Sequence, residues 1–154
     1  DLLILPEPFV TNLLGKNPSF KIKLDITKEW EKLNSSGNSQ GEESQEDLLA
    51  MGALIVRTEF AKANKNAIKL FLDEYKDSVE KAVNDLDGTG DLMVKYNIMP
   101  SKEIAIKAIP GCNIVFIAGK DIEPAIKGFY NVLFESDPKS LGGKIPGEDF
   151  YYVG

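Results

Sequence analysis

The sequence contains no histidine and only one cysteine, Cys112, among its 154 residues. Histidine is the commonest general base and the commonest zinc ligand, so its absence excludes Ser-His and Cys-His catalysis and zinc-dependent hydrolysis in this chain. A single cysteine cannot form an intrachain disulfide or a thiolate metal cluster. Carboxylate chemistry, phosphate chemistry and binding without catalysis remain open.

The sequence also lacks a long apolar run and an excess of basic residues. No run reaches the roughly 18 apolar residues expected of a transmembrane helix. The 18 Lys and Arg residues against 24 Asp and Glu give a net charge of −6, which argues against binding to a nucleic-acid phosphate backbone. The hydrophobic fraction of 43% is enough for a packed core, so a globular fold is expected.

The first part of the chain has the pattern of a strand, a helix and a second strand. Residues 2–5 are continuously apolar, which predicts a buried strand that ends at Pro6. Residues 9–14 have the spacing of a short amphipathic helix, and residues 20–26 alternate as in a half-exposed strand. A chain seldom begins inside a core strand, so we expect this sequence to be part of a longer protein. A strand–helix–strand unit favours a parallel sheet.

Helices dominate the rest of the prediction. Residues 34–49 contain few apolar side chains and predict a solvated loop, whereas residues 50–57 predict a third strand. Apolar residues recur at helical spacing over 68–86, which predicts one apolar face of a helix of about five turns. Ser101 is expected to cap a helix that runs through Ile109, and 122–133 again has helical spacing. Residues 113–117 fit a strand or an extended crossing segment. The predicted fold class is therefore α/β and helix-rich.

Three features that resemble functional motifs have simpler structural explanations. Gly88-Thr89-Gly90-Asp91 resembles a phosphate loop but lacks the Gly-Lys-Ser/Thr ending, so we predict a turn between two helices. The acidic residues of 42–47 lack calcium-loop spacing and predict a solvated loop. Cys112 has no histidine to activate it, and we predict a small buried apolar side chain there.

Glu7 is the most promising candidate for a binding residue. It follows the first predicted strand on a turn bounded by Pro6 and Pro8, and ligands of open α/β sheets collect at the carboxyl ends of strands. Its carboxylate can pair with a cationic ligand or accept hydrogen bonds from ligand donors. It can equally provide a favourable charge at the start of the following helix. Further along, Gly52 after Met51 would let the backbone approach a ligand closely, although a flexible residue at the start of a strand explains the pair slightly better.

Several motifs, read in order, resemble one protein family. Leu3-Ile4-Leu5-Pro6-Glu7-Pro8-Phe9 resembles a segment of the extracytoplasmic solute-binding proteins of ABC transporters, in the branch related to sulfonate, nitrate and thiamine-precursor binders. Met51-Gly52-Ala53-Leu54-Ile55-Val56-Arg57 and the following Thr58-Glu59-Phe60-Ala61 are similar to that family's return crossover strand and its next helix. The stretches 95–100 and 109–114 also fit, and the resemblance covers nearly the whole chain except 34–47.

The resemblance implies a two-lobed fold of the type II periplasmic-binding-protein class, of which this chain would be the C-terminal half. Residues 1–33 would end the second lobe, 50–57 would form the return hinge strand, and 58–154 would supply the closing helices of the first lobe and the tail. The implied ligand cleft consists of two groups of residues and one further position: Pro6, Glu7, Pro8 and Phe9; Met51, Gly52 and Ala53; and Asn113.

The implied function is to bind a small solute outside the cytoplasmic membrane and deliver it to an ABC permease. The implied partners are the solute, the permease and the N-terminal half of the same protein; no nucleic acid, metal, cofactor or catalysis is expected. The implied localisation is periplasmic or as a membrane-anchored lipoprotein. Two alternatives remain open: an enzyme of the same fold that uses carboxylate chemistry, and the ligand-sensing domain of a regulator. A related enzyme that makes the thiamine pyrimidine uses a histidine and a cysteine-rich motif, and this chain has neither.

Overall fold

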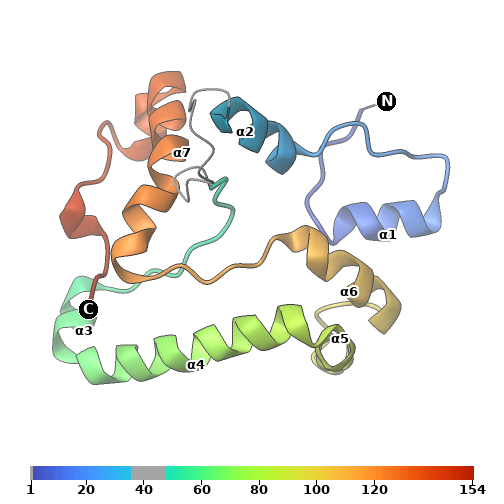
Figure 1. Cartoon of the computed structure of the whole chain (residues 1–154), viewed down its shortest axis with the longest axis horizontal. Coiled ribbons are helices and arrows are strands. Elements are labelled where there is room, and N and C mark those ends of the chain that lie inside the picture. Colours follow the sequence, from blue (N-terminus) through green and yellow to red (C-terminus); the bar gives the residue numbers. More distant parts are fainter. Residues whose placement is uncertain (1, 36–47) are drawn as a thin grey trace. The chain divides into compact units, whose positions relative to one another are not determined.

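The computed structural model describes residues 2–35 and 48–154 of the chain (Figure 1). Two compact units make up the described chain. The first unit contains the chain up to Ile22 together with Asn66–Phe116, and the second contains Lys23–Lys65 together with Ile117–Gly154. Each unit is therefore built from two separate stretches of sequence.

The core of the first unit lies around a short helix, α6. The helices of this unit are α1 (Phe9–Lys16), most of α4 (Lys65–Asn84), α5 (Leu86–Lys95) and α6 (Lys102–Ala108), followed by the 3-10 helix η1 (Ile109–Cys112). Ala105 and Ala108 are 0% exposed and Ile109 is 1% exposed, and Leu86 and Met93 pack against this cluster. Small side chains on α6 allow α5 to approach it closely, and α6 also contacts α1.

The predicted helices of this unit are confirmed, and side-chain caps set two of their starts. The Ser101 hydroxyl accepts a hydrogen bond from the backbone N–H of Ile104 at 3.3 Å, which is the N-cap that the sequence predicts for α6. The carboxylate of Asp85 accepts from the N–H of Gly88 at 2.9 Å and caps α5 in the same way.

The prediction of a helix–helix turn at Gly88-Thr89-Gly90 is wrong, because these residues lie inside α5. The break between α4 and α5 comes earlier, at Asp85, whose cap starts the new helix before the glycines. Gly90 has a packing role there. A Cβ atom at this position would lie 2.9 Å from Cγ of Lys102 on α6, so the missing side chain permits close helix packing.

The second unit is centred on α7 (Ile122–Ser136), which confirms the predicted helix over 122–133. It also contains α2 (Ile26–Ser35), α3 (Thr58–Ala63) and three 3-10 helices, η2 (Gly119–Asp121), η3 (Pro138–Leu141) and η4 (Glu148–Phe150). Trp30 of α2 meets Phe129 of α7 edge to face, with ring centroids 6.0 Å apart. The backbone N–H of Leu48 donates to the carbonyl of Ala125 at 3.0 Å.

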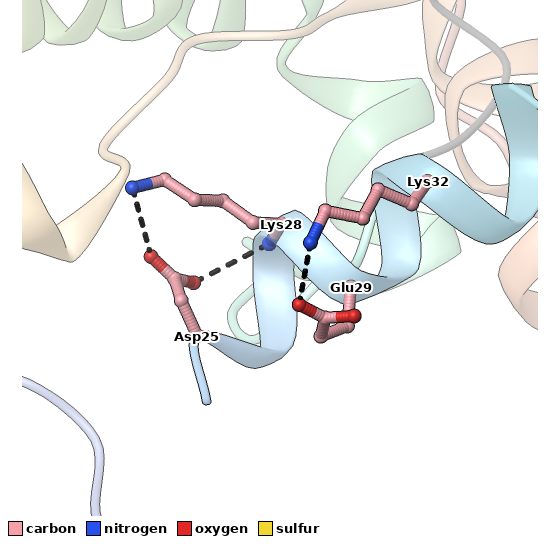
Figure 2. A network of polar contacts seen from close by, with 4 residues as sticks. All are labelled: Asp25, Lys28, Glu29 and Lys32. Atoms are coloured by element: carbon pink, nitrogen blue, oxygen red, sulfur yellow. Dashed lines mark hydrogen bonds and ion pairs between the residues drawn. The ribbon is translucent and has the colours of Figure 1, made fainter. Parts of the chain in front are cut away.

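The α2 helix was not expected from the sequence, which predicts a strand as far as Ile26. Figure 2 shows the polar contacts at its start. The Asp25 carboxylate accepts from the backbone N–H of Lys28 at 3.3 Å and forms an ion pair with the ammonium group of Lys28 at 3.4 Å. One turn along, Lys32 and Glu29 pair at 2.7 Å. Asp25 therefore acts as a helix start in a region where alternation favoured a strand.

The residues that the structure describes contain no β-strand. The predicted strands at 2–5, 20–26 and 50–56 are irregular segments, apart from Ile26 in α2, and 113–117, predicted as a strand or an extended crossing segment, forms no strand. Leu2 is 82% exposed and Ile55 92% exposed, so the segments 2–5 and 50–56 each carry an apolar side chain that the described residues leave uncovered. A strand requires backbone partners on a neighbouring strand, and residues 2–35 and 48–154 supply none. The α/β class and the boundaries at 33, 49 and 57 remain predictions. Most of the predicted solvated loop, residues 36–47, lies outside the described residues.

Candidate functional site

The turn that contains Glu7 is closed by backbone hydrogen bonds at the start of α1. The carbonyl of Pro6 accepts from the N–H groups of Phe9 at 3.0 Å and Val10 at 3.3 Å. The Glu7–Pro8 peptide bond is cis. Pro8 is the residue before the first turn of α1, and its side chain has no capping group. The capping function therefore falls to Glu7.

Both carboxylate oxygens of Glu7 are held by Thr11, one helical turn further on. The backbone N–H of Thr11 donates to Oε2 at 3.1 Å, and its hydroxyl donates to Oε1 at 3.0 Å. The sequence left open whether Glu7 serves the helix or a ligand, and these bonds show that it serves the helix start. Each oxygen has further lone-pair capacity, so the carboxylate can still accept hydrogen bonds from a ligand.

The Glu7 side chain lies against the turn that follows α6. A Cβ atom built on Gly111 would be 3.1 Å from Cγ of Glu7 and 3.3 Å from its Oε1. Glycine at this position thus leaves room for the carboxylate. The two segments are about 100 residues apart in sequence, and the contact between α1 and α6 brings them together.

Cys112 is the next residue along this turn and is only partly buried, in contrast to the predicted buried side chain. Burial raises the pKa of its thiol above the ordinary value of 9.0, and the negative charge of Glu7 raises it further. The thiol is therefore kept protonated near neutral pH. A protonated thiol is a poor nucleophile, and the geometry gives Cys112 no activating base.

Asn12 adds a polar group on the same helix. Its side-chain oxygen is buried and has no hydrogen-bond partner within the described parts of the chain. A buried acceptor without a donor is unfavourable by about 1–3 kcal/mol.

The structure brings some of the predicted ligand-binding residues together and separates others into the two units. Pro6, Glu7, Pro8 and Phe9 form one turn in the first unit, with Phe9 exposed. Asn113 belongs to the same unit and ends the 3-10 helix after Cys112 with a left-handed backbone (φ 48°). The exposed residues Met51, Gly52 and Ala53 belong to the second unit. Their part in a cleft remains a prediction.

Sequence reasoning did not select Thr11, Asn12 or Gly111. The spacing of four residues between Glu7 and Thr11 was the signal available for the first, because a side chain just before a helix can reach the third residue inside it. In sequence, Gly111 after Pro110 indicates only the end of a helix. Its closeness to Glu7 depends on tertiary packing, and no local pattern reports that.

Residues 2–35 and 48–154 include no group of three or more Cys, Asp or Glu side chains placed to hold a metal ion. None of the helices in this part of the chain combines the length and apolarity needed to cross a membrane.

A second polar cluster, around Lys102, has a structural explanation. Its ammonium group lies 2.9 Å from carboxylate oxygens of both Asp87 and Asp91, which ties α6 to α5. The hydrogen bonds that the Lys102 ammonium group donates to Asp91 and Asp87 raise its pKa. Both carboxylates are exposed to solvent and already pair with the Lys102 ammonium group, so the cluster offers a ligand little.

No protein-family model matches the sequence, and comparison with curated proteins and with solved structures finds no significant match.

Proposed function

We propose that this chain forms part of a two-lobed solute-binding protein that works outside the cytoplasmic membrane and delivers a small solute to an ABC permease. The observation that supports the proposal most is the Glu7 carboxylate. It is partly buried at the start of α1 and forms no ion pair with a Lys or Arg of the described chain. A carboxylate held in place without a cationic partner can bind a cation or hydrogen-bond donor from outside.

The chemistry around Glu7 favours a solute that carries an ammonium, amidinium or similar donor group. Glu7 offers two acceptor oxygens, and the neighbouring Cys112 thiol is held in its neutral form by burial and by the charge of Glu7. An anionic solute would be repelled by the carboxylate. Charge-assisted hydrogen bonds of this kind contribute about 1.5–3 kcal/mol each.

The exposed apolar segments support the proposal that another half of the protein completes the fold. Residues 2–5 and 50–56 have the composition of buried strands, but Ile4 is 76% exposed and Ile55 92% exposed. Burying such side chains on pairing stabilises by about 25 cal/mol per Å² of apolar surface. Strands supplied by an N-terminal half would cover them and form the α/β sheet that the sequence predicts.

A ligand screen tests the binding function. Thermal unfolding and native mass spectrometry would be measured with a panel of amines, amidines, aminopyrimidines, sulfonates and amino acids. A binder at a hundredfold excess over its Kd should stabilise the fold by about 2.7 kcal/mol and raise the melting temperature. We expect donor-bearing cations to stabilise and Glu7→Gln to remove the effect.

Glu80→Gln is the matched control, because it removes one negative charge from the exposed side of α4 in the same unit. If no cation in the panel stabilises the wild-type chain, or if Glu80→Gln abolishes binding as Glu7→Gln does, the proposal is wrong. The enzyme alternative is separated by turnover: a substrate consumed by the wild type, with turnover lost but binding kept in Glu7→Gln, would favour catalysis.

A further inference from the structure

The position of the Glu7 carboxylate depends on two residues from different segments of the first unit. Thr11 holds it from α1 with two hydrogen bonds, one to each oxygen, at 3.1 and 3.0 Å. Because each oxygen has its own donor, rotation of the carboxylate group breaks at least one of the bonds. The orientation of the carboxylate plane is therefore fixed as well as its location.

Gly111 limits the space that is available to the Glu7 carboxylate. Cβ contacts of 3.1 Å and 3.3 Å to Glu7 would be too tight, so an alanine here would displace the carboxyl group by a few tenths of an ångström. The backbone of Gly111 is not in the left-handed region, so conformation alone does not demand glycine. The demand comes from the space that the Glu7 side chain occupies.

We propose that Thr11 and Gly111 are positioning residues, which fix the Glu7 carboxylate for its solute. That a solute binds this carboxylate rests on the proposed function, whereas the positioning of the carboxylate by Thr11 and Gly111 does not. Thr11 acts through the two hydrogen bonds and Gly111 through the space that it leaves. Neither residue needs to touch the ligand.

Cys112 provides a readout of the carboxylate position without any ligand. It is the only cysteine of the chain, it follows Gly111, and the charge of Glu7 contributes to its raised pKa. Thiolate formation can be followed by ultraviolet absorbance or by the rate of iodoacetamide alkylation as a function of pH. A carboxylate that moves away from Cys112 must lower the apparent pKa of the thiol and speed its alkylation at a fixed pH.

The experiment is a double-mutant cycle on the whole chain. Glu7→Gln should lower the thiol pKa of Cys112 most, because it removes the negative charge. Thr11→Val keeps the shape and the backbone N–H but removes the hydroxyl, and it should lower the thiol pKa by part of the Glu7→Gln effect. In the Glu7→Gln background, Thr11→Val should change nothing. Thr11→Ser keeps the hydroxyl and should restore wild-type titration.

Gly111→Ala removes the space that the carboxylate occupies, and so tests its positioning without changing Thr11. It replaces Thr11→Val if that variant fails to fold, as judged by far-ultraviolet circular dichroism. Its effect on the thiol pKa should depend on whether Glu7 is present. Equal shifts in the wild-type and Glu7→Gln backgrounds, or no shift with Thr11→Val, would overturn the inference. Failure of the solute screen would leave these titrations unchanged, so the two proposals fail separately.

Binding can then be added with acetamidinium as the probe. It should lower the apparent pKa of Cys112 in the wild type by neutralising Glu7, with a weaker effect in Thr11→Val and none in Glu7→Gln. An equal effect of acetamidinium in all three chains would show that it does not bind at the positioned carboxylate.

Discussion

The segments 102–109 and 50–56 are both short and rich in apolar residues, yet they have opposite fates in the structure. The first forms α6 and the start of η1, where Ala105 and Ala108 are 0% exposed. The second is irregular, and its Ile55 is 92% exposed. A helix satisfies its backbone hydrogen bonds within itself and needs only one surface to pack on, whereas a strand needs a neighbour along its whole length. Apolar composition therefore leads to burial only where the backbone partners are present in the same chain.

The largest expected effect compares one isoleucine from each segment. Ile109→Ala removes a buried side chain beside α6 and should lower the free energy of unfolding by about 2–5 kcal/mol, while Ile55→Ala should change it by about 0.5 kcal/mol or less. Urea unfolding would be followed by labelling of Cys112, which lies in the first unit, and by the fluorescence of Trp30, the only tryptophan, in the second. Equal losses for both variants would show that 50–56 is buried in solution.

The next effect concerns the cap that starts α6. Ser101→Ala removes the acceptor for the N–H of Ile104 and should cost about 0.5–2 kcal/mol, measured by the same urea titration. Ser78→Ala is a suitable control, since the Ser78 hydroxyl only donates to the carbonyl of Glu74 on the exposed part of α4. A loss with Ser78→Ala as large as that with Ser101→Ala would argue against the cap.

Two glycines within helices test how tightly α5 and α6 are packed. Gly15→Ala places a methyl group in open space in the last turn of α1 and should stabilise by up to about 1 kcal/mol. Gly90→Ala would gain the same helix propensity, but its methyl group meets Lys102 at 2.9 Å and Ile106 at 3.4 Å. We expect Gly90→Ala to be less stable than Gly15→Ala in thermal unfolding; the reverse order would mean that α5 and α6 are loosely packed.

The smallest expected effect is on alkaline stability. The hydrogen bonds that Lys102 donates to Asp91 and Asp87 raise its pKa above the ordinary 10.5. A raised pKa in the folded state means that the stabilisation is present below pH 10.5 and is lost as the pH rises through the folded value. The difference in urea midpoint between wild type and Lys102→Met should therefore shrink in that range. A difference that stays constant across the range would mean that the ion pairs contribute nothing.

The helices were the most predictable part of the fold. Apolar spacing over 68–86 located α4, and Ser101 located the start of α6, because both signals are local to the segment that they describe. The start of α2 was missed because alternation over 20–26 favoured a strand, while the capping carboxylate of Asp25 decided for a helix. The predicted strands stay predictions, since the described residues contain no strand with which they could pair.

The candidate site was predictable only in part. Glu7 stands out in the sequence because two prolines flank it at the end of an apolar run. Its attachment to Thr11 follows from spacing along one helix, but its closeness to Gly111 does not. That contact joins segments about 100 residues apart, and it depends on how α1 meets α6.

The sequence by itself determined which chemistry is open to this chain: without histidine and with one cysteine, carboxylate chemistry, phosphate chemistry and binding remain, and Glu7 is the candidate binding residue. It also determined the long helices, whose hydrogen bonds and apolar faces are local. Tertiary structure alone decided that Glu7 and Cys112 share one electrostatic environment, and that Gly90 and Gly111 are needed for space. Packing between distant segments depends on side-chain volumes at both contact surfaces, and one segment of sequence carries information about only one of them.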